Sequence, residues 1–386
     1  MMIHNFDAVI ERGNGDSVKW NTYPGDVLPM WVADADFTAP EPVITALEQR
    51  VAHGVFGYSD WKNEDLKQAV VHWMHTRFSW RPEPDWVAFS PSVVISLALS
   101  VLAFTEPGDS VLFLTPSYPP FFRVPRSHAR KPLTSSLILK NGRYEIDFAD
   151  LEGKAAEPGT RLMYLCNPHN PTGRAFSREE LLRIGALCVK HNVLILSDEI
   201  HCDYVFPGRA HIPFPSLSGE LAERTLVAIN PSKTFNVADL HTSAVISANP
   251  DLLARFKDTA AGLALHSAAL GVIALKTAYM ECAWYADQVA AYVKKNLDLA
   301  ASFINERVPG IRTFVPEATF LLWLDCRAMG LPQKELESFF LDKAKLALNS
   351  GTDFGAEGQG FMRLNLACPK ATVLEALSRL ERAALA

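Results

Sequence analysis

Lys233 is a residue whose position favours covalent chemistry. It stands in the segment NPSKTFN, residues 230–236, directly after the apolar run 225–229, which is typical of a buried strand. A lysine between a strand end and apolar residues is poorly suited to a solvated surface. If its side chain is partly buried, the pKa of the amine falls, because burial disfavours the charged form, and a neutral amine is a nucleophile. The segment therefore predicts a nucleophilic lysine.

Two further segments place polar side chains after apolar runs. The run 161–166 leads into CNPHNPTG, residues 166–173, where two Asn-Pro turns hold amide side chains in a rigid loop. The run 193–197 leads into SDEIH, residues 197–201, where Asp198 and Glu199 follow the strand directly. Each segment also has a purely structural explanation, because Asn-Pro dipeptides are usually plain turns and Asp198 also suits a helix N-cap.

A fourth segment, SPSVVI at residues 90–95, opens a predicted helix. The free N–H groups of a helix start can hold a phosphate, although most helix starts are only structural. No single segment decides the function. The order and spacing of all four carry the signal.

The elements that position these segments alternate between strands and helices. Short apolar runs at 110–114, 161–166, 193–197, 225–229 and 244–247 predict strands, and residues 177–191 predict a helix that begins with a capping box of Ser177 and Glu180. This alternation favours a mostly parallel sheet covered on both faces. In such sheets ligands bind at the carboxyl ends of the strands, where the four segments lie.

The rest of the chain predicts a second, smaller α+β unit. A long helical stretch from about 268 to 306 is followed by a strand at 319–324, a helix near 332–344, a strand at 361–366 and a helix from about 371. We expect an N-terminal segment, 1–45, that packs on the small domain, a large domain, 46–285, and a small domain, 286–386.

Composition excludes several classes of function. With 43 acidic and 37 basic residues the net charge is −6, so a nucleic-acid or anionic-membrane binder is not expected. The longest apolar stretch, 93–104, is too short to span a membrane. The six cysteines form no CxxC pair, and the first residues lack a signal-peptide pattern, which predicts reduced thiols in a cytoplasmic protein without a metal site.

Taken together, these segments resemble the pyridoxal-phosphate enzymes of the aminotransferase class I/II family, over essentially the whole chain. The resemblance is greatest to the MalY/PatB branch of cystathionine and cysteine-S-conjugate β-lyases. The residues that carry it are PMWVADADF at 29–37, TPSYPPF at 115–121, SDEIH at 197–201, SKTFN at 232–236 and RLNLACP at 363–369. It implies an α/β fold of the aspartate-aminotransferase type (fold type I), with a mostly parallel mixed sheet between helices.

The resemblance assigns roles around pyridoxal 5′-phosphate. Lys233 matches the lysine that links to the cofactor and carries the substrate proton, and Asp198 matches the partner of the pyridine nitrogen. Asn170 matches the donor to the ring's phenolic oxygen, and Tyr118 would stack on or lie beside the ring, which makes Lys233 and Tyr118 the predicted catalytic residues. His201 stands where many relatives have a tyrosine that bonds the ring oxygen, and the β-lyase branch often has a histidine there.

The cofactor phosphate would lie on the backbone N–H groups of Val93 and Val94, with help from Ser232. Tyr58 matches a tyrosine that reaches the phosphate of a neighbouring subunit, which implies a homodimer with shared sites; the alternative is an interface aromatic without cofactor contact. Where many aminotransferases have a serine and an arginine on the phosphate, this chain has Asn230 and His241, so whether either one contacts the phosphate stays open.

Arg363 matches the arginine that binds the substrate α-carboxylate, because its planar fork suits a bidentate pair. Ala33 and Asp34 lie where the family's chain approaches the same substrate. The implied activity is carbon–sulfur β-elimination from cystathionine or cysteine S-conjugates, which yields pyruvate, ammonia and a thiol. Two alternatives stay open: an aminotransferase of L-amino acids that uses the same residues, and a protein of this branch with an additional regulatory role through protein binding.

Overall fold

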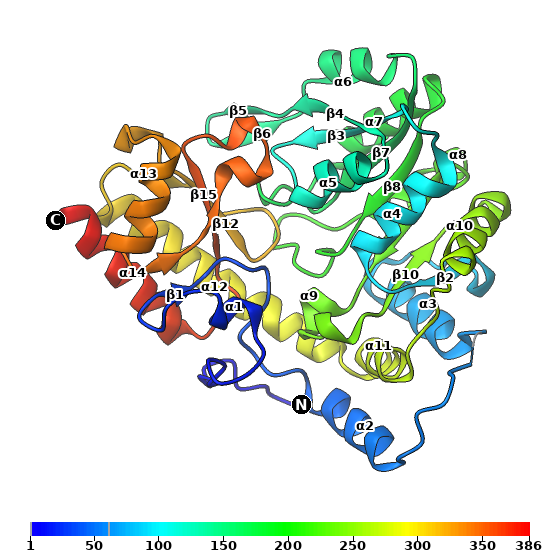
Figure 1. Ribbon diagram of the computed structural model, residues 1–386, viewed down its shortest axis with the longest axis horizontal. Helices are drawn as coiled ribbons and strands as arrows, with labels where there is room; N and C mark the ends of the chain where they lie inside the picture. The colour runs from blue at the N-terminus through cyan, green and yellow to red at the C-terminus, as the bar shows by residue number, and fades with distance from the viewer. Residues whose placement is uncertain (1, 61) are drawn as a thin grey trace.

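The computed structural model describes residues 2–60 and 62–386 and has two main sheets, one in each half of the molecule (Figure 1). The seven-stranded sheet has the order β2-β10-β9-β8-β7-β3-β4. Its strands are β2 (Val87–Ser90), β10 (Ser243–Ile246), β9 (Thr225–Ile229), β8 (Leu194–Asp198), β7 (Thr160–Cys166), β3 (Ser110–Thr115) and β4 (Lys131–Ser136). Strand β10 runs antiparallel to both neighbours, and the remaining pairs are parallel. The predicted mostly parallel sheet is confirmed.

Helices cover both faces of this sheet, because its strands carry apolar side chains on both sides. In β3, Val111 and Phe113 join one buried cluster, whereas Leu112 and Leu114 join another, as the two-residue period of a strand requires. The first cluster includes side chains of α4 (Val93–Phe104), α5 (Pro119–Ser127) and α10 (Pro250–Gly262). The second includes side chains of α6 (Phe148–Ala155), α7 (Arg178–Lys190) and α8 (Gly219–Ala222). The predicted capping box at the start of α7 is present.

The second sheet is antiparallel, with the order β11-β12-β15-β14. Its strands are β11 (Arg312–Thr313), β12 (Leu321–Asp325), β15 (Phe361–Asn365) and β14 (Asn349–Ser350). Helix α14 (Lys370–Leu385) packs against α12 beside it. The helix predicted near 332–344 is only α-helical as α13 (Gln333–Ser338), because Phe339–Lys343 continues it as a π-helix.

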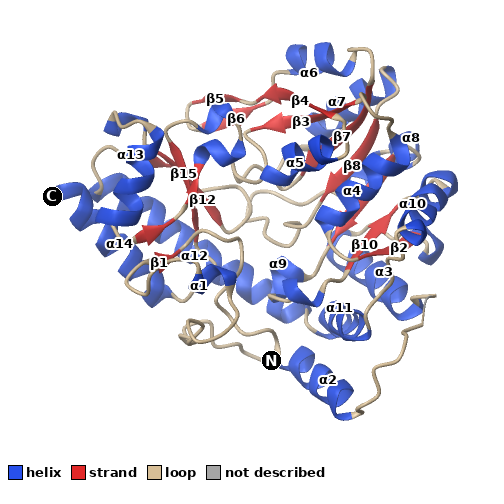
Figure 2. Cartoon of the chain, viewed as in Figure 1, coloured by secondary structure: helices blue, strands red, loops and turns tan. Residues whose placement is uncertain are grey.

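The helical stretch predicted at 268–306 is two helices, not one. Helix α11 (Ala269–Glu281) ends at Cys282, whose backbone (φ −115°, ψ 26°) is not helical, and α12 (Ala283–Arg307) then begins. Helix α11 packs against α2 (Glu41–Ala52) and α3 (Glu64–Phe78). Helix α12 runs from the large-sheet half toward the small sheet (Figure 2). The predicted boundary between the large and small domains, after residue 285, falls inside this helix and stays a prediction.

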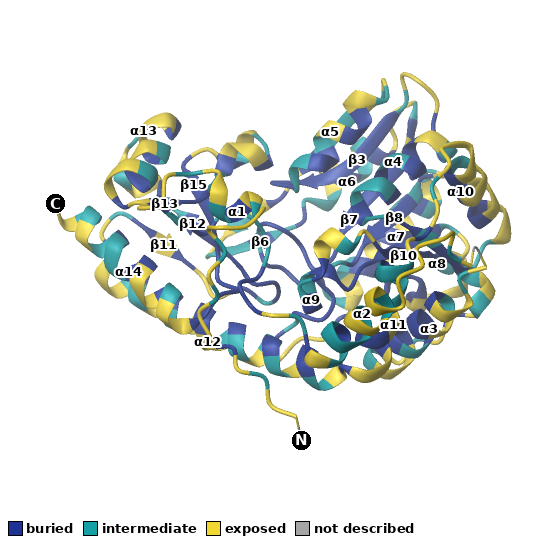
Figure 3. Ribbon diagram, turned by 60° about the horizontal axis from the view of Figure 1, so that its bottom comes forward, coloured by how far each residue is buried: buried dark blue, intermediate teal, exposed yellow. Residues whose placement is uncertain are grey.

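The N-terminal residues contact the small-sheet half. Strand β1 (Leu28–Pro29) pairs in parallel with β13 (Leu346–Ala347), and the N–H groups of Asn365 and Asp36 donate to the carbonyls of Met30 and Ala367. The short helix α1 (Val18–Asn21) precedes β1. The loops between the two main sheets are largely buried (Figure 3). Their polar side chains are therefore held away from water.

One glycine of these loops has no room for a side chain. Gly173 has φ +68°, and a Cβ atom there would lie 2.3 Å from the Cβ of Pro316 and 3.1 Å from the carbonyl oxygen of Ala318. We expect Gly173→Ala to lower the free energy of unfolding by about 2 kcal/mol or more, through overpacking and backbone strain. Gly208→Ala is the matched control, because Gly208 also has positive φ (+93°) but open space around it. Equal shifts of the two urea midpoints would contradict a steric role for Gly173.

Candidate active site

Most of the predicted residues follow strands at the carboxyl edge of the large sheet, because parallel strands end on the same side. Strand β2 leads to the start of α4, β3 to Tyr118, β7 to Asn170, β8 to Asp198 and His201, and β9 to α9 (Ser232–Phe235), which carries Lys233. Arg363 comes from β15 of the small sheet. The site therefore lies between the two main sheets.

Lys233 is fixed from both sides. Its amine Nζ donates to the carbonyl oxygen of Ala33 at 2.6 Å, and its own carbonyl accepts from the hydroxyl of Tyr204 at 3.1 Å. Burial lowers the pKa of the Lys233 amine to about 8, although the charge of Asp34 opposes this shift. The neutral, nucleophilic form of the amine is therefore reached at a much lower pH than for an exposed lysine, although the cation still predominates at pH 7.

Asp198 is 3% exposed at the end of β8. Its Oδ1 accepts from the N–H of Ile200 at 3.2 Å. Burial raises the pKa of this carboxyl to about 7, against the N–H of Ile200 and the charge of Lys233, which lower it. A buried carboxyl group with a raised pKa favours a cationic partner, because a positive charge beside the carboxylate stabilises its ionised form.

Arg363 connects the two halves of the site. Its Nη1 donates to Oδ1 of Asn170 at 3.0 Å, and its Nη2 donates to the carbonyl of Trp31 at 3.0 Å and to Oδ1 of Asn349 at 2.6 Å. The guanidinium lies over the ring of Phe354, 4.8 Å from its centroid. Burial lowers the pKa of Arg363 to about 10, so the group is still a cation at neutral pH. A buried guanidinium of this kind suits a carboxylate partner.

Tyr118 and His201 flank this centre. Burial raises the pKa of Tyr118, and the nearby charge of Asp198 adds to the shift. His201 is buried against Phe320, with ring centroids 5.5 Å apart. Burial lowers the pKa of its imidazole to about 3, with smaller contributions from Lys233 and Arg363. His201 is therefore neutral at physiological pH.

The start of α4 offers backbone donors. The side chain of Ser92 caps the N–H of Ile95 at 3.2 Å, and the N–H groups of Val93 and Val94 in the same turn have no acceptor within the helix. Ser232 is buried at the start of α9, and its N–H donates to Oδ1 of Asn230 at 2.7 Å.

His241 and Tyr58 lie apart from these donors. The side chain of His241 is 68% exposed, and its Nε2 lies 3.7 Å from a carboxylate oxygen of Asp239. Tyr58 is 87% exposed, and its ring contacts that of His266. The phosphate role of Tyr58 stays a prediction, and it requires a second subunit.

Sequence reasoning missed two contacts of Arg363, which are made by Asn349 and Trp31. Asn349 lies on the two-residue strand β14 directly opposite Arg363, and no sequence pattern marks it. Trp31 lies in a segment that the resemblance included, but its contact is made by the backbone carbonyl, which residue type does not reveal.

Two buried polar atoms of the site have no hydrogen-bond partner among the described residues: Nε of Arg363 and Nδ1 of His201. Unpaired buried polar atoms are costly, so a ligand that offers partners to these two atoms would be favoured here. Pyridoxal 5′-phosphate fits this donor set. Lys233 suits its aldehyde, Asp198 its ring nitrogen, Asn170 and His201 its ring oxygen, and the N–H groups at the start of α4 its phosphate.

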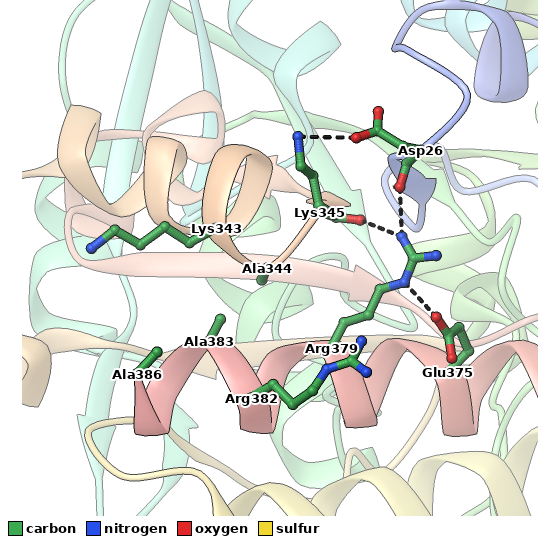
Figure 4. A pocket seen from close by; sticks show the side chains of 9 residues that line it. All are labelled: Asp26, Lys343, Ala344, Lys345, Glu375, Arg379, Arg382, Ala383 and Ala386. Atoms are coloured by element: carbon green, nitrogen blue, oxygen red, sulfur yellow. Dashed lines mark hydrogen bonds and ion pairs between the residues drawn. The ribbon is translucent and has the colours of Figure 1, made fainter.

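The described residues also form a charged hollow outside this site. It lies beside α14, and four of the charged residues that line it are paired, Lys345 with Asp26 at 3.0 Å and Arg379 with Glu375 at 2.7 Å (Figure 4). Across residues 2–60 and 62–386, no group of three or more His, Cys, Asp or Glu side chains is placed to hold a metal ion. In the same residues no helix combines the length and apolar character needed to span a bilayer.

Comparison with known proteins agrees with this geometry. Residues 23–380 match the family described as aminotransferase class I and II. The chain belongs to this family. Cystathionine beta-lyase PatB of Bacillus subtilis (strain 168) is 43% identical over 388 residues, which cover 98% of this chain and 99% of that protein. The resemblance to the MalY/PatB branch of aminotransferase class I and II proteins is thereby confirmed.

Two solved structures of this family have nearly the same fold. Cystalysin from Treponema denticola, which contains a pyridoxal 5′-phosphate cofactor, has a TM-score of 0.96 at 35% identity, over 99% of both chains. The PLP-bound C-S lyase from Staphylococcus hominis has a TM-score of 0.93 at 30% identity, over 100% of this chain and 99% of that one. The predicted fold type I architecture is confirmed.

Proposed function

We propose that this protein is a pyridoxal-phosphate-dependent carbon–sulfur β-lyase. It would cleave β-thioether amino acids, such as cystathionine or cysteine S-conjugates, to a thiol, pyruvate and ammonia. The observation that carries the proposal is the joint placement of Lys233, Asp198 and Arg363 in one buried site. The relatives named as cystathionine beta-lyase and C-S lyase support β-elimination over other reactions of the family.

The bound cofactor would supply an electron sink for the carbanion at Cα of the substrate. The chain supplies the rest. Arg363 binds the α-carboxylate and orients the Cα–H bond, and Nζ of Lys233 removes the Cα proton. Asp198 keeps a positive charge on the ring nitrogen by holding a carboxylate beside it. Loss of the thiolate from Cβ then leaves 2-aminoacrylate, which water converts to pyruvate and ammonia.

Pyruvate release tests the proposed reaction directly. Purified holoenzyme with L-cystathionine, or with a simpler cysteine thioether, should form pyruvate and a thiol in equal amounts without any keto-acid acceptor. Turnover that appears only when a keto acid is added would instead identify an aminotransferase.

Replacement of Arg363 by lysine should raise the KM for the amino-acid substrate about 10- to 100-fold, because a lysine cannot form the bidentate pair with a carboxylate. Arg327→Lys is a suitable control, because Arg327 is an exposed arginine of the same half that pairs with Asp325. Initial-rate kinetics of both variants measure the effect. An unchanged KM in Arg363→Lys would show that the α-carboxylate binds elsewhere.

We also propose that the protein is a cytoplasmic homodimer. Exposed apolar side chains at Val51, Val55, Phe56 and Tyr58, on α2 and the segment after it, support a subunit interface there. All six cysteines are buried and unpaired, which supports a reducing compartment. Light scattering of the purified protein tests the dimer, and a second subunit would be needed for the predicted contact of Tyr58 with the phosphate.

A further inference from the structure

Residues 31–37, called the wall segment below, contact both cationic side chains of the site through their backbone. The carbonyl of Trp31 accepts from Nη2 of Arg363 at 3.0 Å, and the carbonyl of Ala33 accepts from Nζ of Lys233 at 2.6 Å. Nδ2 of Asn365 donates to the carbonyls on either side of Ala33, at Val32 (2.6 Å) and Asp34 (2.8 Å). The position of the wall segment therefore decides where these acceptors lie.

Residues 12–20, called the N-terminal strap below, hold the wall segment from the outside. Asp36, which is 4% exposed, accepts from Nη1 of Arg12 at 2.7 Å, from Nζ of Lys19 at 2.7 Å and from Nε1 of Trp20 at 2.9 Å. Lys19 is 1% exposed, so its charge and that of Asp36 compensate each other in a buried place. Three donors of the strap thus converge on one carboxylate of the wall segment.

Further contacts repeat this link along the wall segment. Nη2 of Arg12 pairs with Oδ2 of Asp34 at 2.9 Å, and Nζ of Lys19 donates to the carbonyl of Asp34 at 3.0 Å. The indole Nε1 of Trp31 donates to the carbonyl of Lys19 at 3.1 Å. A direct path therefore runs from Lys19 through Trp31 to the guanidinium of Arg363.

The orientation of Arg363 depends on this path. A guanidinium is a rigid plane whose N–H groups point in fixed directions, so its acceptors set its orientation. Here they are Asn170, Asn349 and the carbonyl of Trp31. The first two are side chains of the loop 166–173 and of β14, whereas the third moves with the wall segment. A shift of Trp31 would turn the fork away from the α-carboxylate and weaken its binding.

We propose that Arg12, Lys19 and Trp20 are positioning residues for substrate recognition, which act through Asp36 and Trp31 on Arg363. None of them needs to touch the substrate. The inference rests on the proposed function only in that the ligand is an α-amino acid whose carboxylate binds Arg363.

Two ligands that differ only at the carboxylate isolate this role. L-alanine and L-alaninamide have the same amine and the same side chain, and binding of each is followed by the change in absorbance of the bound cofactor. The Kd of L-alaninamide divided by the Kd of L-alanine, called the ligand ratio below, measures how much the carboxylate contributes to binding. In Lys19→Met and Trp20→Phe holoenzyme we expect this ratio to fall about tenfold and about threefold, respectively, through weaker binding of L-alanine.

Asp7→Ala is the matched control. It removes another anchor of the N-terminal residues, the hydrogen bond from the hydroxyl of Tyr292 to Asp7 at 2.5 Å, and its ligand ratio should equal that of the wild type. Equal loss of affinity for both ligands, or an unchanged ratio in Trp20→Phe, would overturn the proposal and leave the strap with a purely structural role. If Lys19→Met does not fold, Trp20→Phe and Arg12→Lys still decide the question.

The ligand ratio does not depend on the reaction that follows binding. An aminotransferase would bind the same carboxylate, so the experiment keeps its meaning if pyruvate release fails. Conversely, normal pyruvate release by the wild type with an unchanged ratio in the variants would overturn the role of the strap alone.

Discussion

Replacement of Lys233 by alanine should lower the rate of pyruvate release by about 10²- to 10⁴-fold, the usual contribution of a positioned acid–base group. The amine is the group that burial brings to a pKa of about 8, and it is held at the carboxyl end of β9 beside Ala33. An alanine leaves no group at this place to take the proton from Cα. Single-turnover measurements of pyruvate formation from a cysteine thioether give the rate directly.

Lys257→Ala is the control, since Lys257 is an exposed lysine of α10. It should keep the activity of the wild type. Addition of methylamine to Lys233→Ala should restore part of the lost rate, because a free amine can carry the same proton. A Lys233→Ala enzyme with half of the wild-type rate would show that another group is the base.

Asp198→Asn should change stability and activity in opposite directions. The folded protein without cofactor holds this carboxyl at a pKa of about 7, against an ordinary value of 3.8. Between these two pH values the folded state binds a proton that the unfolded state has released, so stability falls as pH rises through this window. An asparagine has no charge to lose and escapes this cost.

The expected gain in the free energy of unfolding is about 4 kcal/mol at pH 7.5, and less than half of that at pH 5. Urea titrations of the cofactor-free variant and wild type at both pH values measure it. The loaded variant should lose activity about 10²-fold or more, because no carboxylate then holds the positive charge on the ring nitrogen. Asp239→Asn, at a fully exposed carboxylate, should change neither quantity.

A less stable cofactor-free Asp198→Asn protein at pH 7.5 would contradict the assignment. It would mean that the carboxylate is already paired by groups of the chain itself. The buried charge would then be a structural feature and not one that the cofactor completes.

The large sheet and the edge that carries the candidate site were predictable from sequence because local signals agreed there. Apolar runs, turn residues and the capping box of Ser177 all favoured the same strands and helices, and the strand ends gave the positions of Asp198 and Lys233. The break at Cys282 was not predicted, because apolar helical spacing continues across it without Gly or Pro. The π-helix at Phe339–Lys343 was missed for the same reason, since residue types there are those of an α-helix.

Contacts of the backbone were the least predictable part of the site. The carbonyls of Trp31 and Ala33 face Arg363 and Lys233, yet any residue type offers a carbonyl. Asn349 pairs with Arg363 only because β14 lies opposite β15, and this register depends on tertiary packing. Sequence reasoning therefore finds the side chains that do chemistry better than the groups that hold them in place.

The pairing of β1 with β13 also sets the order in which the site can be assembled. The residues of β1 leave the ribosome first, whereas their partners, Leu346–Ala347, follow more than 300 residues later. The loop that this contact closes is nearly the whole chain, so its entropy cost is met only when the rest of the structure has formed. Because Arg363 also lies on a late strand, β15, a nascent chain that has already folded its large sheet still lacks the small-sheet side of its site. The side of the site that carries Arg363 is therefore completed only after nearly the whole chain has been synthesised.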